Sequence, residues 1–162
     1  RLGASGLSVT IDGGPGDTLQ PPWPGHANWA DLLQTRVDQD DPDVVIIQSI
    51  LFPGAENPAN HDSYLRAAQK LIDIGQSRGA HVYFVQHHRP NNSTEFNAAE
   101  IAERLQGIAA EGRGIGVIPM NWWIARCASP YAFDGWHLSG NGVRCWADAA
   151  NAAINQLRNE RG

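Results

Sequence analysis

Two short strand-like runs constrain the fold of this chain more than any other feature. Residues 43–50 (DVVIIQSI) form a nearly continuous apolar run, and residues 80–86 (AHVYFVQ) form the next one. Continuous apolar runs of this length are typical of strands buried on both faces of a parallel sheet. Between them, Leu65, Leu71 and Ile72 recur at helical spacing. This alternation predicts an α/β fold with a mostly parallel sheet between helices.

The remaining elements follow the same alternation. Further strands are expected at residues 7–11 and 116–120, and helices at residues 29–37, 62–77 and 95–111. Gly79 stands where a C-terminal glycine would end the second helix, and Ser139 is the expected N-cap of a final helix. The apolar face of that final helix is predicted to consist of Val143, Trp146, Ala150, Ile154 and Leu157.

Length and charge narrow the class of protein. The 162 residues fit a single domain with a sizeable core, and no apolar run approaches the length of a membrane span. A net charge of −5 with scattered arginines argues against a nucleic-acid surface. The histidine spacings match no metal-ligand signature, so neither a metal nor a cofactor is expected. The glycine-rich turn at 12–18 lacks the spacing of a dinucleotide-binding loop.

Asp134 and His137 form the motif with the clearest chemistry. A histidine general base needs one ring nitrogen free and the other held by an acceptor, which a carboxylate three residues earlier can supply. The alternative is a surface aspartate that caps its own loop beside an exposed histidine. The loops at 12–18, 51–60, 87–94 and 134–137 are all expected at the carboxyl edge of the sheet, where sites in such folds lie.

The phrase Asp-Gly-Trp-His-Leu-Ser-x-x-Gly at 134–142 resembles the last block of the Ser-Gly-Asn-His (SGNH, GDSL-like) hydrolase superfamily. The resemblance implies a three-layer α/β/α sandwich with a flavodoxin-like sheet across residues 1–162. It also implies a serine triad in which Asp134 orients His137. Asn121, Trp122 and Trp123 are similar to the stretch that precedes this block in SGNH domains attached to bacterial membrane acyltransferases.

Two further blocks match unevenly. Gly16, in the turn Gly16-Asp17-Thr18, resembles the family glycine whose backbone N–H helps to form the oxyanion hole. The strand at 42–47 is similar to the one leading into the next block, but the family asparagine that donates to the oxyanion is missing. Gln48, Ser49 or Asn57 is left as the substitute.

The nucleophile block of the family has no clear counterpart. Gly3-Ala4-Ser5 resembles it superficially, yet no apolar strand precedes Ser5, and only six residues separate it from Asp12. We therefore expect the chain to begin inside the domain. The central first strand and the nucleophilic serine would come from upstream residues or from a second chain.

The resemblance implies a serine esterase or acyl-transfer domain acting on O-acyl esters, with acetyl groups of cell-envelope carbohydrate as the expected substrate. Trp136, His87 and Gln48 are the expected substrate contacts. Core packing is expected to explain most of the tryptophans, Trp23, Trp29, Trp122, Trp123 and Trp136. It is therefore the alternative for Trp136, and a solvated loop is the alternative for His87. An extracellular or periplasmic location is expected, and a membrane tether is compatible with the resemblance. The competing hypothesis is a catalytically degenerate module of the same fold that binds glycan or a protein partner.

The two cysteines bracket the Asp134/His137 segment. A disulfide between Cys127 and Cys145 would tie this segment to the helix behind it and would suit an oxidising compartment. Two buried thiols in a reducing compartment are the alternative, because sequence does not establish pairing.

Overall fold

The protein is described by a computed structural model at residues 8, 10, 28–48, 61–85, 107, 109, 112, 114–130 and 138–161. The helices and strands follow in the order α1 (Trp29–Asp40), β1 (Val44–Gln48), α2 (His61–Gln76), β2 (His81–Val85), β3 (Ile115–Ile118), α4 (Met120–Ile124) and α5 (Gly140–Arg161). The strand predicted at 7–11 and the helix predicted at 95–111 fall largely outside the described residues.

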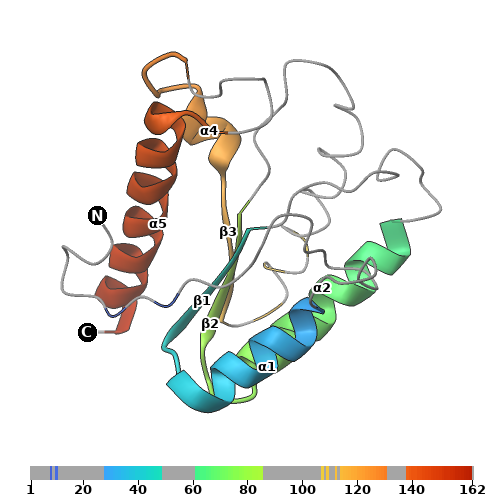
Figure 1. The fold of residues 1–162 in the computed structure, drawn as a ribbon. Helices are drawn as coiled ribbons and strands as arrows, with labels where there is room; N and C mark the ends of the chain where they lie inside the picture. The colour runs from blue at the N-terminus through green and yellow to red at the C-terminus, as the bar shows by residue number, and fades with distance from the viewer. Residues whose placement is uncertain are drawn as a thin grey trace.

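The three strands form a parallel sheet in the order β1-β2-β3. The central strand β2 places Tyr83 opposite Ile46 on one side and opposite Gly116 on the other. Parallel neighbours need a crossover connection, and α2 lies in the connection between β1 and β2. The predicted α/β fold with a parallel sheet is therefore confirmed (Figure 1).

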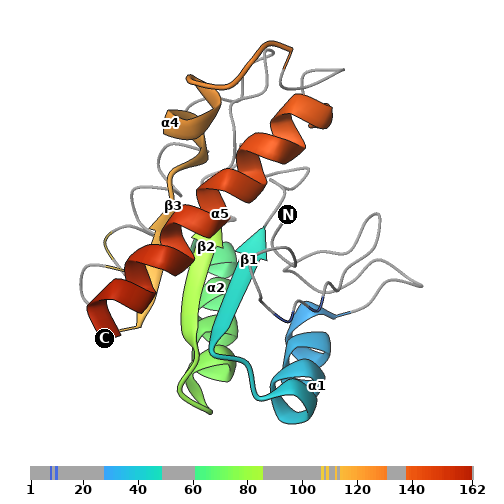
Figure 2. The same ribbon diagram turned by 90° about the vertical axis from the view of Figure 1, so that its left-hand side faces the viewer.

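Helices cover both faces of this sheet, α1 and α2 on one side and α5 on the other, while α4 lies beyond the carboxyl edge of the sheet and packs against α5 (Figures 1 and 2). Successive strand side chains point to opposite faces, so every strand contributes to both cores. The core on the α1/α2 side includes Val37, Val45, Ile47, Ala68, Leu71, Ile72, Val82 and Phe84. The core on the α4/α5 side includes Tyr83, Val85, Ile118, Met120, Ile124, Ala150 and Leu157.

Tyr83 joins the sheet to α5. Its hydroxyl donates to the carbonyl oxygen of Ala153 at 3.2 Å, and its ring lies over Gly116 of the neighbouring strand. A Cβ atom at position 116 would approach the Tyr83 ring to 2.4 Å, well inside van der Waals contact. Glycine is therefore required here by close packing, because a larger residue would displace the tyrosine and cost roughly 1–3 kcal/mol.

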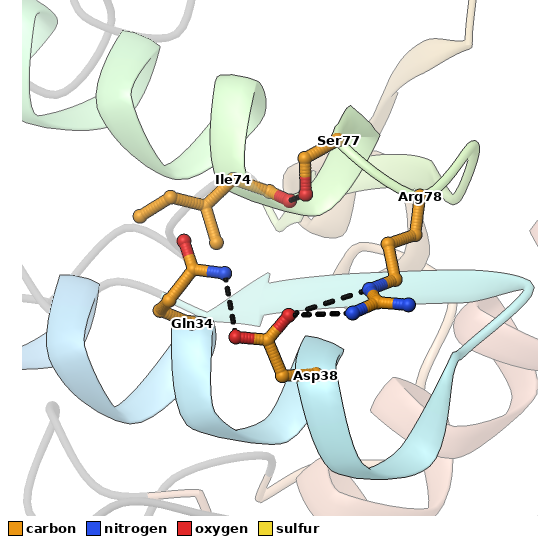
Figure 3. Close-up of polar contacts among 5 residues, drawn as sticks. All are labelled: Gln34, Asp38, Ile74, Ser77 and Arg78. Carbon is orange, nitrogen blue, oxygen red and sulfur yellow. Dashed lines mark hydrogen bonds and ion pairs between the residues drawn. The ribbon is translucent and has the colours of Figure 1, made fainter.

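A polar contact links α1 to the turn after α2 (Figure 3). The Asp38 carboxylate accepts from the Gln34 amide at 3.0 Å and pairs with Arg78 at 3.0 Å. The hydrogen bond from Gln34 and the Arg78 guanidinium lower the pKa of Asp38. A lowered pKa means that the ionised Asp38 carboxylate is more stable in the folded protein than in the unfolded chain. Its contribution to the free energy of unfolding is therefore lost as the pH falls through the folded-state pKa. Both side chains are half-exposed, and water therefore keeps the contact weak.

The structure corrects two details of the sequence prediction. The last strand was expected to reach Met120, but β3 ends at Ile118 and Met120 begins the unpredicted helix α4. Val143 was expected on the buried face of α5, but it is 55% exposed. The other four residues predicted for that face are buried or packed against the core. Within the described residues, no helix combines the length and apolar character that a membrane crossing requires.

Candidate active site

The carboxyl edge of the sheet is the expected location of the site. Because the three strands are parallel, Gln48, Val85 and Ile118 end at the same edge. Gln48 is exposed there, directly after the buried Ile47. Its role as a substrate contact or oxyanion donor stays a prediction.

Most of the other predicted site residues lie outside the described part of the chain. This applies to Asp134, His137, Trp136, Gly16 and His87, and also to Ser5 and to the alternative donors Ser49 and Asn57. Their roles stay predictions. The structure does, however, describe both ends of the segment that carries Asp134 and His137.

One hydroxyl group connects those two ends. The Ser139 hydroxyl donates to the carbonyl oxygen of Pro130 at 2.5 Å and accepts from the backbone N–H of Gly142 at 3.3 Å. The second bond is an N-cap, and the Val143 N–H also bonds the Ser139 carbonyl at 2.8 Å, so the predicted cap is confirmed. The segment 131–137 therefore starts and finishes at the N-terminus of α5.

The predicted disulfide is also present. Cys127 and Cys145 are paired, with Cα atoms 6.1 Å apart, a usual separation for a disulfide. The bridge joins the end of the α4 region to the second turn of α5, and both sulfur atoms lie within 3.3 Å of the Trp123 carbonyl oxygen. The base of the 131–137 segment is thus fastened covalently as well as by hydrogen bonds.

Apolar packing holds the same region against the sheet. Met120 and Ile124 of α4 are buried, and Trp123 and Leu138 pack against the same core. Leu138 is the residue directly after His137, so the backbone that leaves the histidine is anchored in the α4/α5 core. We define this assembly of α4, the disulfide, Ser139 and Leu138 as the loop frame.

Sequence analysis missed an exposed aromatic beside the loop frame. Trp122 is 50% exposed, and the Arg126 guanidinium lies over its ring at 3.7 Å from the centroid. Core packing was expected to explain most tryptophans, and it does explain Trp29, Trp123 and Trp146. The sequence held two hints of this exposed ring. Adjacent residues of a helix point in different directions, so Trp122 and Trp123 cannot both face one core. Arg126 follows Trp122 by four residues, the spacing at which side chains meet on a helix surface.

Among the residues that the structure describes, no three His, Cys, Asp or Glu side chains are grouped so that they could hold an ion.

Comparison with known proteins gives one informative likeness. A crystal structure of a "putative acylhydrolase" from Bacteroides fragilis NCTC 9343 superposes with a TM-score of 0.62. The match covers 79% of this chain and 70% of that protein, at 16% sequence identity. The two proteins share a fold. No family model and no curated protein matches the sequence.

This likeness agrees with the SGNH resemblance at the level of fold. At 16% identity it shows a shared α/β fold, while the substrate and the mechanism have to be argued from the residues of this chain.

Proposed function

We propose that this protein is a serine ester hydrolase or O-acyltransferase domain of the SGNH (GDSL-like) type. The observation that carries the proposal is the loop frame, because it fastens both ends of the segment that contains Asp134 and His137, in a fold shared with the compared acylhydrolase. A segment that carries a catalytic base has to be held in place, since small misplacements of a base cost much of the rate.

The proposed reaction is acyl transfer through a covalent intermediate. A serine hydroxyl attacks the ester carbonyl while His137 removes its proton, and Asp134 fixes the imidazole tautomer and stabilises the imidazolium. His137 then gives the proton to the departing alcohol oxygen, and water or an acceptor hydroxyl releases the acyl group. The backbone N–H of Gly16 donates to the oxyanion, a contribution of about 3–4 kcal/mol at the transition state.

The nucleophilic serine of this proposal lies upstream of Arg1, where the order of the family blocks puts it. Gln48, Ser49 or Asn57 is proposed as the second donor to the oxyanion, and the exposure of Gln48 at the end of β1 is compatible with that role. Trp136 and His87 are proposed to contact the substrate.

The proposed substrate is an O-acyl ester, with acetyl on a cell-envelope carbohydrate as the first choice. An extracellular or periplasmic location accompanies this choice, and the Cys127–Cys145 bridge supports it because disulfides persist in oxidising compartments. The same proposal includes a tether that joins this domain to a membrane protein.

Acetate release tests the proposed function. The full-length protein is expected to hydrolyse p-nitrophenyl acetate and to release acetate from O-acetylated xylan, with both activities blocked by a serine-directed inhibitor. An added acceptor saccharide that gains the acetyl group would identify a transferase. A folded protein that releases no acetate from either ester would contradict the proposal and favour the binding module.

A further inference from the structure

Trp122 presents an indole ring to solvent near the edge of the sheet where the substrate is expected. It lies on α4, which begins two residues after β3 ends, beyond the carboxyl edge of the sheet (Figure 1). Large aromatic side chains are normally covered, yet Trp122 keeps 50% of its surface exposed even with Arg126 over the ring.

Two neighbours hold the ring in one orientation. Arg126 lies 3.7 Å from the centroid of the Trp122 ring and donates from Nη1 to the Trp122 carbonyl oxygen at 2.8 Å. On another side, the Trp123 ring meets Trp122 edge-on at 75°, with centroids 5.3 Å apart. Because both rings and the guanidinium are already ordered, a ligand that stacks here loses little side-chain freedom. We refer to this pair as the Trp122–Arg126 stack.

The stack also carries a positive charge. Within the described residues the Arg126 guanidinium contacts Trp122, and no carboxylate pairs with it. This matters in a chain with a net charge of −5, where an arginine could easily find an acidic neighbour. The unused donors of a guanidinium match the two oxygens of a carboxylate. A ligand suited to this surface thus has both an apolar ring face and a carboxylate.

We propose that the Trp122–Arg126 stack is a subsite for an acidic saccharide, a pyranose ring that bears a carboxylate. The C–H face of the pyranose would lie on the exposed part of the indole, because polarised C–H groups are attracted to the negative face of an aromatic ring. Its carboxylate would accept hydrogen bonds from Arg126. The choice of a saccharide rests on the proposed function, and it narrows the acceptor or substrate of that same site to acidic carbohydrate.

Direct binding tests this subsite without any need for turnover. The probes are trigalacturonate, which carries carboxylates, and neutral galactotriose, each titrated into the full-length protein by calorimetry. The wild type is expected to bind trigalacturonate more tightly than galactotriose. Trp122→Ala is expected to weaken trigalacturonate binding about tenfold, the effect of one lost aromatic contact. Arg126→Ala should remove the preference for the acidic probe.

Three further variants make the result decisive. Trp122→Phe keeps a flat ring and is expected to retain most of the affinity, while Arg126→Lys keeps the charge without the planar fork and is expected to lose part of the preference. Arg158→Ala, an exposed arginine near the far end of α5, is the matched charge control and should bind as the wild type does. Circular dichroism of each variant shows that it is folded.

The outcomes separate this inference from the proposed function. Absence of trigalacturonate binding, unchanged binding by folded Trp122→Ala, or equal loss in Arg158→Ala would each overturn the subsite. Acetate release without saccharide binding would leave the esterase proposal standing and remove the subsite. Saccharide binding without acetate release would leave the subsite standing and contradict the esterase proposal.

Discussion

His137→Ala is expected to abolish ester turnover in a protein that still folds. Without the imidazole, the serine hydroxyl has no base and the leaving alcohol has no proton donor, so both halves of the reaction fail. We expect a loss of about 10⁴-fold or more in kcat, as for other triad histidines. Initial rates on p-nitrophenyl acetate measure the loss, and circular dichroism with a thermal melt confirms that the variant is folded.

The control for this experiment is a histidine at the opposite edge of the sheet. His81 begins β2, and its ring stacks on Tyr83 with centroids 4.6 Å apart. His81→Phe removes an imidazole but keeps an aromatic ring in that stack, so its turnover should resemble that of the wild type. Substantial residual turnover in folded His137→Ala would mean that His137 is not the base.

Loss of the Cys127–Cys145 bridge is expected to have the second largest effect. Its sequence separation of 18 corresponds to a stabilisation of about 3 kcal/mol in the chain-entropy account of disulfides. For a chain of this size the double variant Cys127→Ser/Cys145→Ser should melt about 6–12 °C below the wild type. Turnover should fall as well, because the bridge is part of the loop frame that holds the His137 segment.

Thermal melts with and without reductant measure this effect. Reductant should lower the melting temperature of the wild type to that of the double variant and should leave the double variant unchanged. Peptide mapping under non-reducing conditions identifies the linked pair directly. A wild-type melting temperature that reductant does not change would contradict the role assigned to the bridge.

The sequence predicted the fold well where its signal came from burial. The apolar runs that became β1 and β2 alternate between two cores, and Leu71 and Ile72 lie on the buried face of α2 as their spacing indicates. Ser139 was recognised as a cap because a hydroxyl before a periodic segment has a specific bonding role. α1 runs on to Asp40, past its last apolar residue Val37, where periodicity carries no further information.

The errors lie where local pattern and tertiary contact diverge. β3 ends at Ile118 and α4 begins at Met120, on either side of Pro119. The apolar residues before and after Pro119 were predicted as one strand, because a buried residue such as Met120 is apolar whether it lies in a strand or in a helix. Val143 fits the helical period of α5, but more than half of its side chain is exposed, and periodicity alone does not show where a neighbouring element stops covering a helix. Trp122 was grouped with the core tryptophans because composition does not distinguish the two members of an adjacent pair.

The candidate site stays a prediction, made from a motif and a resemblance that point to Asp134 and His137. The described structure adds contacts at both ends of their segment, through Ser139 and the Cys127–Cys145 bridge. A triad is defined by contacts among residues far apart in sequence, and spacing alone does not give those contacts.

The measurement that tests the central claim most directly is fluorophosphonate labelling of the full-length protein, with the adduct located by mass spectrometry. The account predicts one adduct, on a serine upstream of Arg1, that disappears in His137→Ala. An adduct on Ser5 would contradict the placement of the nucleophile block. A folded protein that acquires no adduct would contradict the serine-hydrolase mechanism itself.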